Sequence, residues 1–110
     1  PRDASLSTEV LAAKIQAARA RQSQRNRALG QPGPNSALDG RALEAACAPL
    51  AQIEPVLQDI LRLHRLGGRA RVRLLRVART LADLSERDTV LPDDLLEAAA
   101  LRGYARLATV

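Results

Sequence analysis

The sequence lacks the large aromatic and thioether side chains that often fill a protein core. Its 110 residues include no Phe, Trp or Met, and Tyr104 is the single tyrosine. Leu, Val, Ile and Ala must therefore form the core, and Ala and Leu have high helix propensities. Val and Ile are too few and too scattered to build a sheet. We predict one all-α domain over residues 1–110, a small bundle of four or five helices.

Three chemically reactive residue types occur only once, as Cys47, His64 and Lys14. A single Cys excludes an intrachain disulfide, and one Cys with one His excludes a zinc-finger type cluster, so we expect no metal site. The phosphate loop Gly-x-x-x-x-Gly-Lys-Ser/Thr requires a lysine beside glycines, and no glycine lies near Lys14. We interpret Cys47 as a small buried residue and His64 as a packed or solvated residue, and neither as a catalyst. The chain alone therefore cannot hydrolyse a nucleotide.

The chain also lacks long apolar segments. No apolar run approaches the roughly 20 residues of a membrane span, and no charged and then apolar signal segment opens the chain. These absences predict a cytoplasmic protein with no membrane partner. Because the sequence starts at Pro1 and not at Met, we expect it to be a piece of a longer protein.

The breaker residues divide the chain into segments. We expect a first helix from the N-cap Ser7, with an apolar stripe formed by Val10, Leu11, Ile15 and Ala18. Arginines dominate after Ala18, so the second half of this helix is expected to be solvated or to face a partner. Residues 29–38 are predicted to form an internal loop. The later helices are expected from the N-cap Asp39 to Pro49, from Pro55 to Gly67-Gly68, over 69–84, and from Pro92 onward.

Arginine dominates the positive charge, which gives a net charge of +5. Seven arginines and no acid lie between residues 62 and 79. Arg69, Arg73 and Arg76 share one helix face, and like charges at this spacing repel each other by a few tenths of a kcal/mol per pair. Such a row is either solvated or directed at an anion. Arg69 is the best candidate, because helix N-termini favour phosphate and Gly67-Gly68 would allow a tight turn and close approach.

Several interpretations of this basic helix remain open. It could be a solvated face after a Gly-Gly turn, part of a helical adaptor without a ligand, or a stand-alone basic module that binds nucleic-acid backbone. A helix-turn-helix with base readout is disfavoured, because the helix has a full core face and no Asn or Gln for base contacts. The core face consists of Leu74, Leu75, Ala78 and Leu81.

The run Gly-Arg-Ala-x-x-Arg-Leu-Leu-Arg-Val-Ala-Arg-Thr-Leu-Ala-Asp-Leu at residues 68–84 resembles the C-terminal lid of magnesium-chelatase-like AAA+ ATPases, particularly the ComM-like competence group. Supporting matches are the arginine-rich first helix, residues 35–38, Cys47 and residues 90–98. The resemblance implies an N-terminal α/β ATPase core, absent from this chain, which carries the phosphate loop and holds Mg²⁺. It also implies a homo-oligomeric, hexameric ring.

The resemblance assigns roles to individual residues. Gly67-Gly68-Arg69 matches the sensor-2 position, so Arg69 would be the catalytic arginine that reaches the γ-phosphate of ATP at a subunit boundary. Gly67, Gly68, Arg69 and Arg73 would form the nucleotide-binding set. In ComM-like members hydrolysis is coupled to remodelling of DNA, and in chelatases to metal insertion into a porphyrin.

Two further features follow from the comparison with the family pattern. Arg79 and Asp83, four residues apart in the specific run, are expected to form a structural pair. The family usually has Leu-Ser-x-Arg-Ala-Tyr where this chain has Leu-Gly-Gly-Arg-Ala-Arg at residues 66–71. A serine N-cap is therefore lost, and Arg71 replaces an aromatic residue, which predicts a different packing of the lid.

Overall fold

The computed structural model describes residues 2–104, with residues 2–7 described by their backbone alone. Its elements are α1 (Arg2–Ala28), the 3-10 helix η1 (Asn35–Ala37), α2 (Gly40–Ala46), the 3-10 helix η2 (Leu50–Gln52), α3 (Glu54–Leu63), α4 (Gly68–Leu84) and α5 (Pro92–Leu101). No strand occurs in this described range. The prediction of a small all-α bundle is therefore confirmed. None of the described helices is long and apolar enough to cross a membrane.

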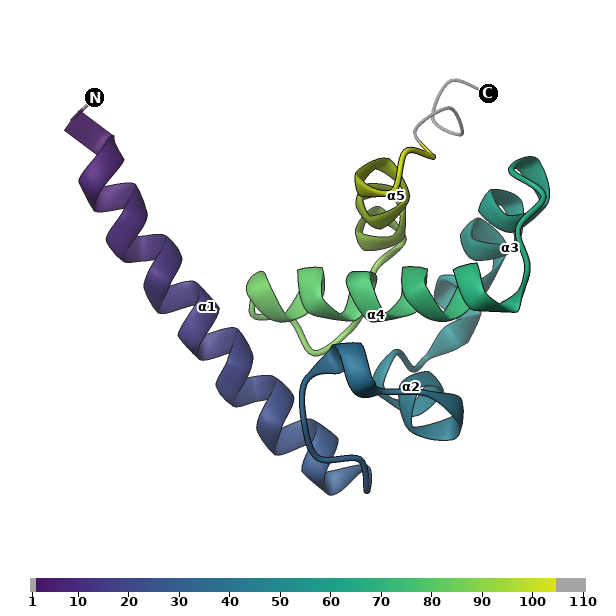
Figure 1. Cartoon of the computed structure of the whole chain (residues 1–110), viewed down its shortest axis with the longest axis horizontal. Coiled ribbons are helices and arrows are strands. Elements are labelled where there is room, and N and C mark those ends of the chain that lie inside the picture. The colour runs from purple at the N-terminus through teal and green to yellow at the C-terminus, as the bar shows by residue number, and fades with distance from the viewer. Residues whose placement is uncertain (1, 105–110) are drawn as a thin grey trace.

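Helix α4 is the centre of the bundle. It packs against α1, α2, α3, α5 and η1, and Figure 1 shows it lying between α5 on one side and η1 with α2 on the other. The core consists of Leu38, Leu43, Ala46, Cys47, Ile53, Leu57, Ile60, Leu74, Leu75, Ala78, Ala82, Val90, Leu95, Ala98 and Ala99. Leu81, which we expected in the core face of α4, is only partly buried against it.

The junction between α3 and α4 differs from the prediction. Helix α3 ends at Leu63 and does not continue to Gly67-Gly68. Arg65 adopts the left-handed conformation at φ 53°, and the Leu66 N–H donates to the carbonyl of Leu61 at 2.8 Å. This is a helix C-cap of the Schellman type, in which an apolar residue after the cap turns back onto the bundle. Leu66 does so, and Gly67 is left as the N-cap of α4.

Helix α1 corrects two further predictions. It starts at Arg2, so Ser7 lies inside the helix and is not its N-cap. The apolar stripe is largely exposed, with Leu11 at 56%, and only Ala18 in it is buried. The second half is the part that packs against the bundle, because its polar side chains find buried partners there; Asn26 is 0% exposed.

The short helix α2 begins after Asp39, as predicted, although the side chain of Asp39 does not cap it. The Asp39 carboxylate instead accepts a hydrogen bond from Gln31 Nε2 at 2.9 Å. The helix ends at Ala46, before Pro49.

Helix α5 opens with Pro92 in its first turn, as predicted. The buried carboxylate of Asp94 accepts hydrogen bonds from the Leu91 N–H at 2.8 Å and from both terminal amino groups of Arg87, at 2.7 and 2.6 Å. Burial raises the pKa of Asp94, but the hydrogen bonds from Arg87 and Leu91 outweigh it, so that the pKa lies below its ordinary value. Asp94 therefore stabilises the start of α5 in its charged form.

We expect Asp94→Asn to lower the free energy of unfolding at neutral pH by about 1.5–3 kcal/mol, the range for hydrogen bonds to charged groups. Because the pKa is depressed in the folded state, this stabilisation is present above the unfolded pKa of about 3.9 and is lost as the pH falls through the folded value. Urea unfolding of wild type and variant at neutral and strongly acidic pH measures it. A difference that persists undiminished in acid would contradict this role.

Candidate functional site

Arg69 lies in the first turn of α4 and is exposed. Among the described residues its guanidinium has no hydrogen-bond or ion-pair partner. Gly67 has an extended backbone (φ −108°, ψ −161°), so the reversal of the chain is made by Arg65 and not, as we expected, by the glycine pair. A Cβ at Gly67 or Gly68 would meet no atom within 4 Å. Packing within the described chain therefore requires neither glycine, and both face open space.

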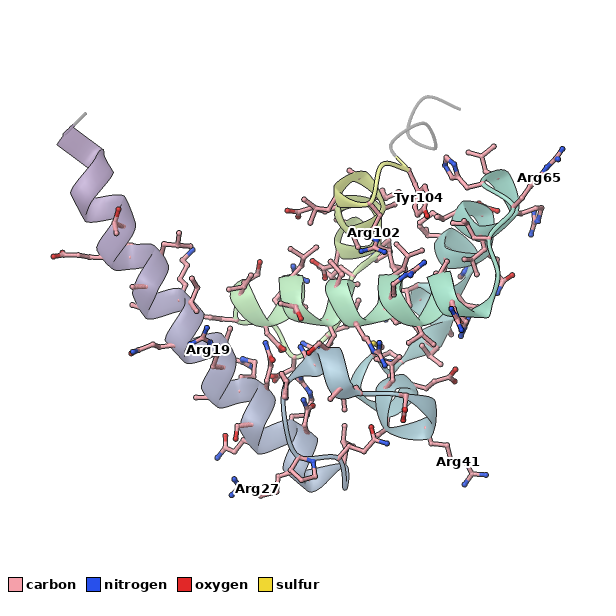
Figure 2. All side chains as sticks on the ribbon, in the orientation of Figure 1. Arg19, Arg27, Arg41, Arg65, Arg102 and Tyr104 are labelled. Atoms are coloured by element: carbon pink, nitrogen blue, oxygen red, sulfur yellow. The ribbon has the colours of Figure 1, made fainter. Side chains whose placement is uncertain are left out.

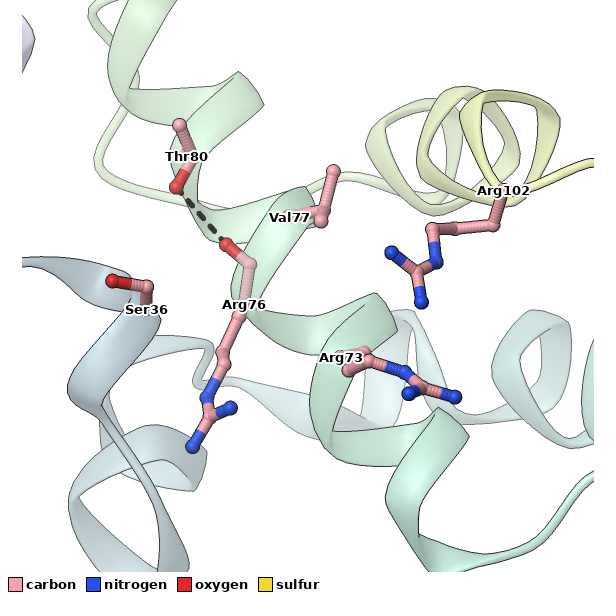
Figure 3. Close-up of a pocket in the computed structure, with 6 residues that line it drawn as sticks. All are labelled: Ser36, Arg73, Arg76, Val77, Thr80 and Arg102. Carbon is pink, nitrogen blue, oxygen red and sulfur yellow. Dashed lines mark hydrogen bonds between the residues drawn. The ribbon is translucent and has the colours of Figure 1, made fainter.

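A groove runs along α4 from Arg69. It consists of two adjoining depressions that share Arg73 and Arg76, and we call it the arginine groove. The first depression is lined by Gly68, Arg69, Val72, Arg73 and Arg76. The second is lined by Ser36, Arg73, Arg76, Val77, Thr80 and Arg102. Figure 3 shows Arg102 reaching from the end of α5 toward Val77 and Arg73.

The groove unites residues that the sequence did not place together. We predicted Arg69, Arg73 and Arg76 on one face of one helix, and all three line the groove. Arg102 and Ser36 were missed. Arg102 follows the last residue of α5 and Ser36 lies in η1, so only the packing of these elements against α4 brings them to the groove.

Arg76 is the arginine that the fold holds in place. Its Nε donates to the carbonyl of Leu38 at 2.7 Å, which leaves both terminal amino groups without a hydrogen-bond partner in the described chain. The hydroxyl of Thr80 donates to the Arg76 carbonyl at 3.1 Å and accepts from Asn35 Nδ2 at 3.1 Å. The hydroxyl of Thr80 is thus used in hydrogen bonds within the fold, whereas the terminal amino groups of Arg76 remain available to bind a ligand.

No acidic residue lines either depression. Arg73 and Arg102 are exposed, and neither has an ion-pair partner in the described part of the chain. Guanidinium groups that share a site without a carboxylate repel one another and bind phosphate or carboxylate oxygens through paired N–H donors. The arrangement is chemically suited to hold anions.

A buried polar network beneath the groove positions its walls. The carboxylate of Asp83 is 0% exposed and accepts from Arg25 at 2.7 and 3.0 Å and from Asn35 Nδ2 at 2.9 Å. It also pairs with Arg79 at 3.0 Å, which confirms the predicted structural pair. Since Asn35 opens η1, this network sets the position of Ser36 against α4.

Arg79 extends the network to distant segments. Its guanidinium donates to the carbonyls of Ala46 and Asp88, both at 2.8 Å, and of Arg87 at 2.7 Å. Burial lowers the pKa of Arg79, an effect that the nearby carboxylate of Asp83 opposes. Its contacts mark Arg79 as a structural arginine and not as a ligand-binding one.

Arg71 is also a structural arginine. It donates to Glu54 at 2.7 and 3.0 Å and lies 3.5 Å from Glu44, so it joins α4 to α2 and α3. The hydrogen bond from Arg71 is the main reason why the pKa of Glu54 is lowered. This chain therefore has an ion pair where the resemblance implied an aromatic residue, and the expected difference in the packing of the lid stays a prediction.

Cys47 and His64 are packed residues. Cys47 is 0% exposed, and burial raises the pKa of its thiol to about 11. The ring of His64 lies 5.0 Å from that of Tyr104. Within residues 8–104, whose side chains are described, no group of three or more His, Cys, Asp or Glu side chains is placed to hold a metal ion.

Comparison with known proteins places the chain in a family. The family model for "Magnesium chelatase, subunit ChlI C-terminal" matches residues 5–102. The chain belongs to this family. No curated protein and no solved structure matches it. The all-α bundle is thus the C-terminal helical domain of a magnesium-chelatase-like protein, and the arginine groove is a feature of this lid.

We expect Asp83→Asn to lower the free energy of unfolding by about 3–5 kcal/mol, because removal of one partner leaves buried guanidinium charges uncompensated. Asp88→Asn is the matched control. It removes the same charge from a side chain that is 94% exposed and pairs with Arg21, so it should cost about 1 kcal/mol or less. Chemical denaturation of both variants measures the difference. Equal effects would show that the network does not hold the lid together.

Proposed function

We propose that this lid supplies Arg69 to the γ-phosphate of ATP at a subunit interface of a magnesium-chelatase-like AAA+ ATPase of the ComM-like group. The lid would thereby couple hydrolysis to the remodelling of DNA or another substrate. The observation that carries the proposal is the exposed guanidinium of Arg69, without a partner in the described chain, in the first turn of a 17-residue helix.

The start of α4 offers further donors to a phosphate. The first backbone hydrogen bond of α4 runs from the Arg71 N–H to the Gly67 carbonyl at 3.1 Å. The N–H groups of Gly68, Arg69 and Ala70 have no acceptor within the helix, as at any helix N-terminus. These groups and the helix dipole favour a phosphate beside Arg69. The open space around Gly67 and Gly68 leaves room for it to approach.

Arg73 lies one turn after Arg69 and completes the proposed nucleotide-binding set. Hydrolysis spreads negative charge over the γ-phosphoryl oxygens, and a guanidinium placed there stabilises the transition state. The ATPase core of the parent protein would hold Mg²⁺ and most of the nucleotide. In a homo-oligomeric, hexameric ring the lid could contact the nucleotide of its own or of a neighbouring protomer, and its movement would transmit the nucleotide state.

We expect Arg69→Ala in the full-length protein to lower ATP turnover at least about tenfold, a conservative bound compared with arginine fingers. Arg41→Ala is the matched control. Arg41 is also exposed and lies in the first turn of a helix, α2, but it does not line the groove. Steady-state ATPase assays on both variants, with thermal melts to check folding, test the role. Unchanged turnover in Arg69→Ala would remove Arg69 from the site.

A second prediction concerns the 110-residue chain by itself. Because the core would supply most contacts, including the phosphate loop that this sequence lacks, the isolated lid should bind ATP weakly or not at all. Isothermal titration calorimetry measures this directly. Tight binding of one ATP per chain would contradict the division of roles between core and lid.

A further inference from the structure

The arginine groove is longer than a γ-phosphate contact requires. It extends along α4 from Gly68 to Thr80, which at 1.5 Å per residue is about 18 Å. The proposed sensor contact occupies only the end at Arg69. The proposed function gives Arg73 a second contact to the nucleotide, but it explains neither Arg76 nor Arg102, which line the rest of the groove.

The groove also gathers several uncompensated positive charges in one place, whereas Arg27 and Arg41, which are unpaired in the described chain as well, lie on separate helices. Several other arginines have an acidic partner; Arg25 and Arg79 pair with Asp83, Arg71 with Glu54, and Arg87 with Asp94. The four arginines of the groove have none in the described chain. A row of guanidiniums is therefore left uncompensated along one face of the most central helix.

We propose that the arginine groove binds consecutive phosphates of a nucleic-acid backbone. A single small anion would neutralise one or two of its four arginines, whereas a linear polyanion can follow the whole row. Duplex DNA carries a phosphate about every 3.4 Å of axis on each strand, and because each strand winds around that axis, its consecutive phosphates lie farther apart than this rise, so that a groove of this length spans a few of them. The charge and the length of the groove both match such a ligand.

The lining of the groove favours nucleic acid over a protein surface. Protein interfaces bind through apolar and aromatic anchors at their centre. Val72 and Val77 are the only apolar residues of the groove, and both are already partly buried against the core. None of the exposed large apolar side chains of the described chain lies there. No Asn or Gln lines it either, so binding is to the backbone and independent of sequence.

The groove residues have distinct parts in this binding. The carbonyl of Leu38 fixes Arg76 through its Nε, so the two terminal amino groups are presented with little loss of side-chain entropy. Arg73 and Arg102 supply charge from opposite walls, from α4 and from the end of α5. The exposed hydroxyl of Ser36 adds a neutral donor at the edge.

The test measures binding of a short labelled DNA duplex of mixed sequence to the 110-residue chain, by fluorescence anisotropy without nucleotide. Affinity is followed from about 50 to about 200 mM salt, where log K falls with a slope of about 0.9 per neutralised phosphate. With four groove arginines engaged we expect a slope of about 3 to 4 in magnitude. The double variant Arg73→Gln with Arg102→Gln should lower the magnitude of this slope by about 2.

The matched control is Arg27→Gln with Arg41→Gln. These two arginines are exposed, have no ion-pair partner in the described chain and lie on α1 and α2 away from the groove (Figure 2). The control removes the same charge but leaves the groove intact. It should therefore change the slope by much less than Arg73→Gln with Arg102→Gln. Equal changes would show a response to net charge alone and would overturn the groove as the site. Thermal melts confirm that both double variants fold.

Two further measurements identify the ligand. Inorganic pyrophosphate is titrated into wild type and into Arg102→Gln; if the variant loses pyrophosphate but keeps duplex affinity, the groove takes small phosphates and the proposal fails. Sedimentation compares the self-association of wild type with that of the double variant Arg73→Gln with Arg102→Gln. If this variant loses self-association but keeps its affinity for the duplex, the groove is a protein-binding surface and the proposal is overturned. Because Arg102 is outside the nucleotide-binding set, failure here leaves the role of Arg69 in ATP turnover intact.

Discussion

The buried carboxylate of Asp83 is the contact on which the rest of the lid depends. It pairs with Arg25 of α1 and with Arg79 of its own helix, and it accepts a hydrogen bond from Asn35 of η1. Arg79 in turn donates hydrogen bonds to the carbonyls of Ala46, Arg87 and Asp88. One acid thus joins segments that are far apart in the sequence. Because a charge in a core is tolerated only when it is paired and hydrogen-bonded, none of these partners is free to move independently of the others.

The described arginines that bind carboxylates and the arginines of the groove lie in opposite environments. Arg71 and Arg87 resemble Arg25 and Arg79 in that they bind carboxylates and connect elements. The arginines of the groove share the same residue type but face no acid in the described chain. Composition alone could not separate these groups, because a guanidinium serves both purposes. The separation arises from where the acids lie, and it leaves the guanidiniums of the groove free to bind the phosphates that we propose as ligands.

Some of this structure could be predicted from the sequence. Breaker residues located most helices, and the spacing of Arg79 and Asp83 within a family-specific run predicted their pairing. The predictions failed where contacts between distant segments determine whether a side chain is buried or which surface it lines. Arg25 and Asn26 look like surface residues until Asp83 and Asn35 are placed beside them, and a left-handed Arg65 cannot be recognised when glycines follow two residues later. Arg102 reaches the groove only because the end of α5 packs across α4, which no local pattern encodes.

The long first helix has a mechanical consequence. Helix α1 is continuous over 27 residues, about 40 Å at the usual rise, and its second half is fixed to the bundle through Arg21, Gln22, Arg25 and Asn26. Its first half projects from the body (Figure 1) and carries exposed apolar side chains. Arg25 and Gln22 of this helix both bind Asn35 at the start of η1, so a shift of α1 would also displace the edge of the groove.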